Sequence, residues 1–206
     1  VHTMNVKGNP DTLALNPAHV YRVVAHTVPP RFTDSAVVTP GKHTIIGIPT
    51  PLGDLEFKML GLNPENQHLN VIVRQADQMK TLHIQGFTEK QRYIVGKYDL
   101  EILTLPRTYI EDVEISQSHT TTIEIPQAGS ATFSKLGYGY GSVYLQTKDG
   151  LELVVDLSLT KERESLSLQP GDYVAVFRPK QARGSIFTVE RKFKVTSGAS
   201  VAVKLN

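Results

Sequence analysis

Apolar and polar residues alternate along much of this chain. The alternation is clear in residues 98–103, 113–116, 187–195 and 200–205. Successive side chains of a β-strand point to opposite faces, so a period of two predicts strands that bury one face. A sustained i, i+3, i+4, i+7 spacing, which an amphipathic helix would need, is hard to find. The pattern therefore predicts an all-β chain.

Turn-forming residues separate the expected strands. Asp149-Gly150 lies between the alternating runs 144–148 and 151–155, and this dipeptide tolerates the positive φ angles of a type I′ turn. We therefore expect a two-residue hairpin at that position. Asp77-Gln78 marks a weaker counterpart earlier in the chain.

The same phrases recur along the sequence, which indicates an internal repeat. Tyr21, Tyr98 and Tyr173 open similar passages at nearly equal spacing. Gly53, Phe57, Leu60 and Gly61 recur later in the chain, all at one constant offset, as Gly129, Phe133, Leu136 and Gly137. A repeat of about 76 residues predicts that one small fold is built more than once.

The repeat divides the chain into three parts. Residues 45–122 and 123–206 are each long enough for about seven short strands, which suits a small antiparallel sandwich. We therefore expect tandem small β-sandwiches of an immunoglobulin-like or transthyretin-like kind. Residues 1–44 are interpreted as the terminal strands of a preceding or partial unit. They belong to a preceding sandwich or pack onto the first full unit as extra strands.

Composition limits the classes of function. The 22 basic and 20 acidic residues give a net charge of +2, so no strong field would attract nucleic acid. Cysteine is absent, which excludes disulfide frameworks and thiolate metal sites. No apolar run reaches the roughly 18 residues of a membrane span. The start at Val1 without a leader, inside a repeat unit, suggests an excised fragment.

One segment superficially matches a metal-binding loop. Asp156, Ser158 and Thr160 follow the spacing that supplies oxygen ligands to magnesium in von Willebrand A domains. That site also needs a strand leading into a helix and further acidic ligands from other loops. An alternating surface strand explains the segment better, so we expect no metal.

The loop Gly137–Gly141 is the main candidate for binding. Its glycines do not follow the spacing of phosphate-binding loops and no helix follows it, which makes a nucleotide improbable. Tyr138 and Tyr140 could stack on a sugar or a partner side chain, or fold down over the end of the sandwich. The basic cluster Arg178, Lys180 and Arg183 could bind an anionic partner or be simply solvated. The loop at Asn63–Gln67 is a second variable loop.

We expect no catalytic residue and no cofactor. The seven histidines form no His-x-x-x-His pair with a nearby acid, and His43 and His119 are interpreted as equivalent turn positions. Gly-x-Ser-x-Gly is absent, and no carboxylate pair stands out from the strand surface.

Several phrases resemble known β-domains. The passage Leu168–Phe177 and the closing Gly198–Leu205 look like the ending of transthyretin-like or carboxypeptidase-regulatory-like sandwiches. More narrowly, the phrases at Tyr21–Pro30, Thr39–Thr44, Gly96–Pro106 and Phe177–Lys180 resemble the region that follows the von Willebrand A domain in secreted or envelope proteins of Bacteroidetes. The resemblance implies a stalk or docking region outside the cytoplasm, and it transfers no site residue, because the ion site belongs to the A domain.

Two functions from different classes follow. The first is a non-catalytic accessory region that displays or braces a ligand-binding domain and contacts protein or glycan through its loops. The second is an extracellular carbohydrate-binding module, or a noncatalytic domain of a glycan-processing enzyme. The absence of tryptophan argues against a strong sugar platform.

Overall fold

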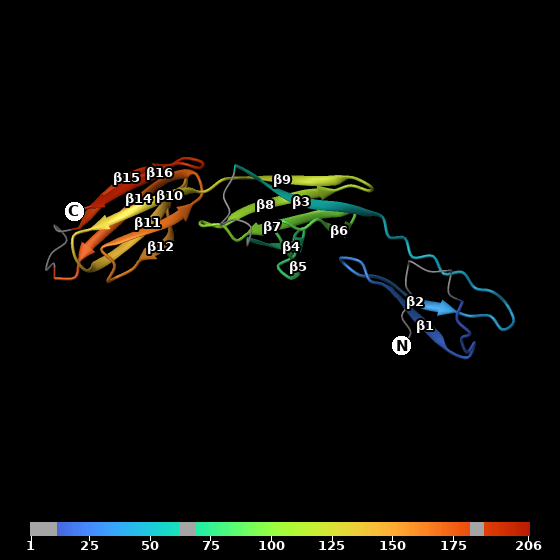
Figure 1. Ribbon diagram of the computed structural model, residues 1–206. Coiled ribbons are helices and arrows are strands. Elements are labelled where there is room, and N and C mark those ends of the chain that lie inside the picture. The colour runs from blue at the N-terminus through green and yellow to red at the C-terminus, as the bar shows by residue number, and fades with distance from the viewer. Residues whose placement is uncertain (1–11, 62–68, 182–187) are drawn as a thin grey trace.

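The computed structural model describes residues 12–61, 69–181 and 188–206. Within these ranges the chain forms sixteen β-strands and no helix, which confirms the predicted all-β fold class. The strands fall into three groups that follow one another along the molecule (Figure 1). We call them the amino-terminal hairpin, the middle unit and the C-terminal unit.

Each group is defined by its strands. The hairpin consists of β1 (Val20–Ala25) and β2 (Arg31–Val37). The middle unit consists of β3 (Leu52–Leu60), β4 (Asn70–Gln75), β5 (Thr81–Gly86), β6 (Gln91–Ile94), β7 (Gly96–Ile102), β8 (Thr108–Ile115) and β9 (Thr120–Pro126). The C-terminal unit consists of β10 (Gly129–Lys135), β11 (Gly139–Gln146), β12 (Leu151–Leu157), β13 (Arg163–Leu168), β14 (Gly171–Pro179), β15 (Val189–Val195) and β16 (Ser200–Leu205).

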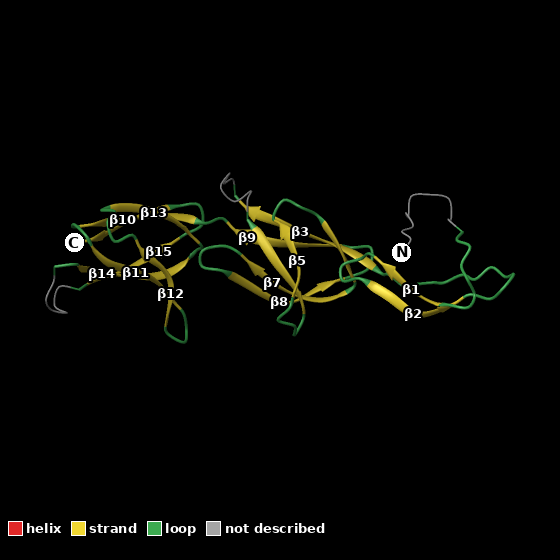
Figure 2. Ribbon diagram, turned by 90° about the horizontal axis from the view of Figure 1, so that it is seen from below, coloured by secondary structure: helices red, strands yellow, loops and turns green. Residues whose placement is uncertain are grey.

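The two complete units have the same topology. In the middle unit a three-stranded sheet, β6-β3-β9, is paired with a four-stranded sheet, β5-β4-β7-β8. The C-terminal unit repeats this arrangement as β13-β10-β16 and β12-β11-β14-β15. Figure 2 shows β10 and β13 on one side of the C-terminal unit and β11, β12 and β14 on the other. Neighbouring strands are antiparallel except for β3 with β9 and β10 with β16, where the first and last strands of a unit run parallel.

Alternating apolar side chains fill the space between the sheets of each unit. In β3 the burial alternates along the strand, and Leu55 is fully buried. The middle core includes Leu55, Phe57, Val71, Val73, Tyr98, Leu100, Ile102, Val113, Ile115 and Ile125. The C-terminal core includes Ala131, Phe133, Val143, Leu168, Tyr173, Ala175, Phe177, Val195, Val203 and Leu205. The residues that alternate with a period of two thus form strands that each bury one face in the core.

A tyrosine near the start of the fifth strand closes each complete unit. The Tyr98 hydroxyl donates to the carbonyl of Ile94 (2.5 Å), and the Tyr173 hydroxyl donates to the carbonyl of Gln169 (2.6 Å). Both tyrosines are buried, so each hydroxyl needs the partner it has. These bonds explain why the repeat is most visible at tyrosine.

Glycine is required where the first strand of each unit passes the turn before the last strand. A Cβ added at Gly53 would lie 2.2 Å from the carbonyl oxygen of Ser116, and one at Gly129 would lie 2.6 Å from that of Thr196. No side chain fits at such distances. The repeated glycine at this offset therefore reflects a close backbone approach.

The structure corrects two details of the sequence analysis. The hairpin between β11 and β12 exists, but its loop spans residues 147–150 and is closed by Thr147 N–H donating to the carbonyl of Gly150 (2.8 Å). Only Gly150, with φ +141°, has a positive φ there, so the turn is not type I′. The division drawn between residues 122 and 123 falls inside β9, which stays paired with β3 as far as Pro126.

Candidate interaction surface

The residues singled out for binding lie together at one end of the C-terminal unit. Tyr140 in β11 and Arg178 in β14 are direct partners across the two strands. The backbone N–H of Lys180 donates to the carbonyl of Tyr138 (2.9 Å), which holds the two chain segments side by side. The tyrosine side chains are 60% and 62% exposed. They therefore do not fold down over the sandwich end.

The glycines of this loop explain why its tyrosines face outward. Gly139 and Gly141 take the inward positions of β11, and both are buried. A Cβ at Gly139 would lie 2.7 Å from the ring of Phe177, so glycine leaves room for that ring in the core. The residues between and before the glycines, Tyr140 and Tyr138, are left on the surface.

Apolar and basic groups surround the two tyrosines. Leu136 is 76% exposed, and Leu159 is joined to the loop because the Gly139 N–H donates to its carbonyl (3.3 Å). We call the set Leu136, Tyr138, Tyr140, Leu159, Arg178 and Lys180 the terminal patch. Tyrosine and arginine are, together with tryptophan, enriched among the residues that contribute most binding energy at protein interfaces. Arg183 and the loop Asn63–Gln67 lie outside the described residues.

The segment that resembled a metal loop is not one alternating strand as expected, because β12 ends at Leu157 and residues 158–160 lie in the loop before β13. The exposed carboxylate of Asp156 accepts a hydrogen bond from the Ser142 hydroxyl (2.6 Å). The Ser158 N–H donates to Glu164 (2.8 Å). Across residues 12–61, 69–181 and 188–206, no group of three or more histidine, aspartate or glutamate side chains is placed to hold a metal ion.

Lys135 is a buried charge that sequence reasoning missed. Its side chain continues the inward row of Ala131 and Phe133, and its ammonium donates to the carbonyl of Ser158 and lies 5.9 Å from the centroid of the Phe177 ring. Burial lowers the pKa of Lys135. The middle unit has Met59 at the equivalent position. A lysine at a position where the alternation predicts an inward apolar side chain was therefore the sequence signal for this buried charge.

Glu101 is a second buried charge that sequence reasoning missed. Its carboxylate is paired with the guanidinium of Arg74 (2.6 Å) and with that of Arg107. The hydrogen bond from Arg74 lowers the pKa of Glu101, and Arg107 lowers it further against the opposing effect of burial. Two arginines that hold one carboxylate leave it no proton to exchange near neutral pH, so we assign the cluster a structural role.

The described histidines do not gather into a site. The ring of His83 lies against Tyr93, with 6.1 Å between centroids, and His19 lies near Tyr21 at 6.4 Å. His43 is not the equivalent of His119, because Lys42 N–H donates to Thr39 as His119 N–H donates to Ser116. The repeat offset at this turn is therefore longer by one position than the sequence comparison assumed. His2 and His68 lie outside the described residues.

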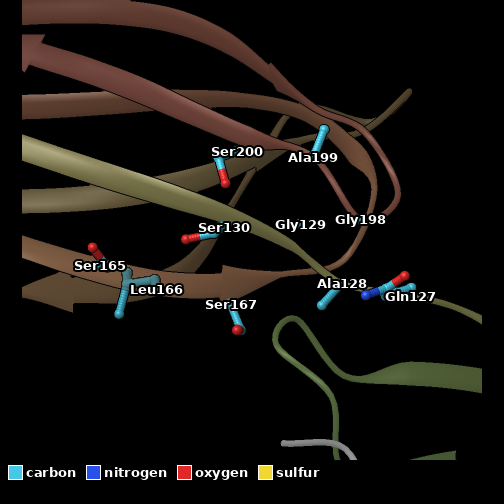
Figure 3. Close-up of a pocket in the computed structure, with 10 residues that line it drawn as sticks. All are labelled: Gln127, Ala128, Gly129, Ser130, Ser165, Leu166, Ser167, Gly198, Ala199 and Ser200. Atoms are coloured by element: carbon cyan, nitrogen blue, oxygen red, sulfur yellow. The ribbon is translucent and has the colours of Figure 1, made fainter. Parts of the chain in front are cut away.

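A shallow hollow lies near the junction of the two complete units (Figure 3). It has a volume of about 320 Å³ and is lined by Gln127–Ser130, Ser165–Ser167 and Gly198–Ser200. Ser167, Ser130 and Ser200 form one row across β13, β10 and β16. The lining contains no acidic, basic or histidine side chain, so it provides no group for general acid–base chemistry.

A repeated contact joins each group of strands to the next. The Ile94 N–H of the middle unit donates to the carbonyl of Val28 in the β1–β2 turn (2.8 Å). The Gln169 N–H of the C-terminal unit donates to the carbonyl of Leu105 in the β7–β8 turn (2.7 Å). Val28 also packs against the middle core and Leu105 against the C-terminal core. We call this contact the joint.

The two joint turns share their internal structure. Val28 and Leu105 each precede a cis proline. The hydroxyls of Thr27 and Thr104 donate to the carbonyls of Pro29 and Pro106, both at 2.7 Å. The joint is therefore a property of the repeat unit, because the same turn presents the same carbonyl to the next unit twice.

No family model matches the chain, and no curated protein matches it. Solved structures that match include the minor pilin GBS52 of Streptococcus agalactiae, which is 12% identical over 74% of this chain and 94% of that chain, with a TM-score of 0.37. The pilus adhesin SpaC of Lactobacillus rhamnosus GG is 9% identical over 75% of this chain and 31% of its own, with a TM-score of 0.26.

A leucine-rich repeat protein of Bacteroides thetaiotaomicron also matches. It is 10% identical over 75% of this chain, with a TM-score of 0.26, and the chain spans about a quarter (26%) of its length. With TM-scores below 0.5, these structures assign neither a family nor an activity to the chain. Across the described residues, no helix is long and apolar enough to cross a membrane.

Proposed function

We propose that this chain is a non-catalytic stalk whose sandwich units are held end to end, and that it displays or braces a ligand-binding domain outside the cytoplasm. The joint carries the proposal. Val28 and Leu105 each add an apolar side chain to the core of the following unit and accept a hydrogen bond from it. Such a contact fixes the direction in which one unit follows another, which a stalk requires.

Two further observations support the stalk. The hollow at Gln127–Ser130 presents hydroxyl and backbone groups without a titratable side chain. The phrases at Tyr21–Pro30 and Gly96–Pro106 resemble the region after a von Willebrand A domain in envelope or secreted proteins. That resemblance supports an A domain as the displayed domain and a location outside the cytoplasm.

Spin-label distances between the two complete units test the stalk. The chain has no cysteine, so labels can be placed on cysteines introduced at Met79 and Leu151, which are 91% and 54% exposed. We expect one narrow distance distribution, and we expect Leu105→Ser to broaden it. Leu153→Ser makes the same change at a residue that is 58% exposed and lies outside the joint. This control should leave the width of the distance distribution unchanged. A broad distribution in the unaltered joint would contradict the proposal.

The terminal patch favours a second role in binding a protein or, secondarily, a glycan. Arg178 and Lys180 lie where β14 enters the β14–β15 turn, which is the counterpart of the two joint turns. This position favours a neighbouring protein domain as the partner, because the other two turns contact protein there. Binding to a glycan array that disappears in Tyr140→Ala would show the carbohydrate-binding role instead.

A further inference from the structure

The residues ahead of β1 match the fourth strand of the C-terminal unit. Leu13-Ala-Leu15-Asn16-Pro17 precedes Tyr21 as Leu166-Ser-Leu168-Gln169-Pro170 precedes Tyr173, with one extra residue before Tyr21. The Tyr21 hydroxyl donates to the carbonyl of Asn16 (3.0 Å), as the Tyr173 hydroxyl donates to that of Gln169 (2.6 Å). Residues 12–17 are therefore the sequence counterpart of residues 165–170, which include the second half of β13.

The residues after β2 match the last strand. Gly41, with φ +69°, and the bond from Lys42 N–H to Thr39 reproduce the turn that Gly198, with φ +68°, makes before β16. Ile48-Pro49 then matches Ile125-Pro126 at the end of β9, at the same offset that relates Lys42 to His119. Residues 12–49 thus contain the equivalents of β13, β14, β15 and β16. We call them the partial unit.

The partial unit lacks the counterparts of β10, β11 and β12. In the complete unit β10 lies between β13 and β16, and β11 lies beside β14. In the partial unit, accordingly, residues 12–17 and 44–49 form no strand, and among the described strands β1 pairs with β2 alone. The equivalents of two buried residues are exposed. Leu15 is 36% and Ile46 37% exposed, whereas Leu168 and Val203 are 0% and 4% exposed.

We propose that this open face binds a three-stranded segment of the same repeat type, which supplies the equivalents of β10, β11 and β12. Its first strand would lie between residues 12–17 and 44–49 and pair with both, and its second would pair with β1. Unpaired strand edges beside apolar side chains are the usual template for an added strand. This inference does not depend on the stalk role.

The segment is expected to be joined to the chain ahead of residue 12. In the two complete units the third strand is followed by the fourth after loops of residues 87–90 and 158–162 only, so the missing strands belong close to residue 12 in the chain. The strands β10–β12 span residues 129–157, whereas only residues 1–11 precede the partial unit. Residues 1–11 are therefore too few to supply the three strands by themselves.

Hydrogen exchange of the 206-residue chain gives the first test. Amides of residues 20–25 and 44–49 should exchange about a hundredfold faster than those of β14 and β9, because no described strand pairs with residues 44–49 or with the second edge of β1. Leu15→Ser should leave all exchange rates unchanged, whereas the matched change Leu168→Ser should expose the C-terminal unit. A monomer that protects residues 44–49 as well as β9 would overturn the proposal. A dimer that protects them would make a second copy the occupant and overturn it too.

A graft gives the second test. Residues 128–162 replace residues 1–11 ahead of Thr12, and Ala25→Phe restores the ring that Phe177 provides in the C-terminal unit. We expect protection at residues 20–25 and 44–49 to rise about a hundredfold. Adding Ile46→Asp and Ile48→Asp should abolish the gain without affecting residues 52–205.

A second graft distinguishes a donor segment that fits the partial unit poorly from a partial unit that binds no such segment. It uses residues 51–90 of the middle unit with Ala25→Ile, the residue type of Ile102. Protection from either graft supports the proposal. Absence of protection with both grafts overturns it.

Discussion

The middle and C-terminal units share their interior design and differ on their surfaces. Both place three strands against four in the same order, and both use a buried tyrosine and a glycine at the same points. On the outer face of the four-stranded sheet, the middle unit presents a row of Ile84, Ile72, Glu101 and Tyr109. The C-terminal unit has Asp156, Ser142, Val176 and Glu190 at the same four positions.

The difference teaches where this repeat is constrained. Inward positions must fill one space between two sheets, so they stay apolar or find a partner as Lys135 does. Outward positions carry no such demand. In the middle unit, outward positions carry the Glu101 ion cluster. In the C-terminal unit, they carry residues of the terminal patch.

The largest expected effect comes from emptying one core. Phe133→Ala removes a fully buried ring that lies edge-on to Phe193, and we expect it to lower the free energy of unfolding by about 3–5 kcal/mol. Hydrogen exchange should show the loss in residues 129–205. Phe57→Ala is the matched change in the middle unit. If Phe133→Ala exposed β3–β9 equally, the two units would be one cooperative body.

Alkaline pH should separate the two units next. Burial raises the pKa of Tyr98 to about 12 and that of Tyr173 to about 12, and it also raises the pKa of Tyr93. A raised pKa gives stability that is present below the ordinary value of 10.0 and is lost as pH rises toward 12. With two such tyrosines, the middle unit should lose more, on the order of 2 kcal/mol per tyrosine.

Urea unfolding of separately produced residues 50–127 and 128–206 at pH 9 and pH 11.5 measures this difference. Tyr93→Phe should reduce the alkaline loss of the middle unit toward that of the C-terminal unit. Equal losses in the unaltered units would show that Tyr93 does not titrate as its burial implies.

A smaller effect is expected from the Glu101 cluster. Glu101→Gln leaves Arg74 and Arg107 without their carboxylate and should cost the middle unit about 1–2 kcal/mol at neutral pH. Because the pKa of Glu101 is lowered, its stabilisation is present above the ordinary value of 4.5 and is lost as pH falls through the lowered value.

The acid branch of the stability curve tests that assignment. Thermal unfolding of the middle unit between pH 6 and pH 3 should become less dependent on pH in Glu101→Gln. The C-terminal unit has Val176 at this place and serves as the control. An unchanged pH dependence would remove Glu101 as its cause.

The smallest effect on stability is expected at the terminal patch. Tyr140 is 62% exposed, so Tyr140→Ala should change the free energy of unfolding by less than about 0.5 kcal/mol. Chemical denaturation checks this value. A loss several times larger would show that the tyrosine belongs to the structure of the end and not to a binding surface.

The repeat and the strand class could be predicted because they leave local marks. Alternation in residues 187–195 and the spacing of Tyr98 and Tyr173 are visible in one dimension. The joint could not be predicted, because Leu105 packs on the core of another unit. The residues next to Leu105 in the sequence carry no pattern that indicates this contact. The Glu101 ion cluster could not be predicted either, since Arg74 and Glu101 are brought together by the pairing of β4 with β7.

The binding candidates show an intermediate case. Tyr138 and Tyr140 were noticed because glycines surround them, and Arg178 because it lies in a basic cluster. That Tyr140 and Arg178 are direct neighbours depends on the register of β11 with β14. In this register Gly141 pairs with Phe177 at inward positions, and a single sequence does not pair such positions in advance.

The parallel pairing of first and last strands determines how a unit would respond to mechanical tension. In the middle unit β3 and β9 are in register from Asp54 with Thr120 to Leu60 with Pro126. Because the chain enters at the start of β3 and leaves at the end of β9, pulling on both ends slides these strands past each other. All hydrogen bonds between them then bear the load at once, rather than breaking one after another as a zipper does.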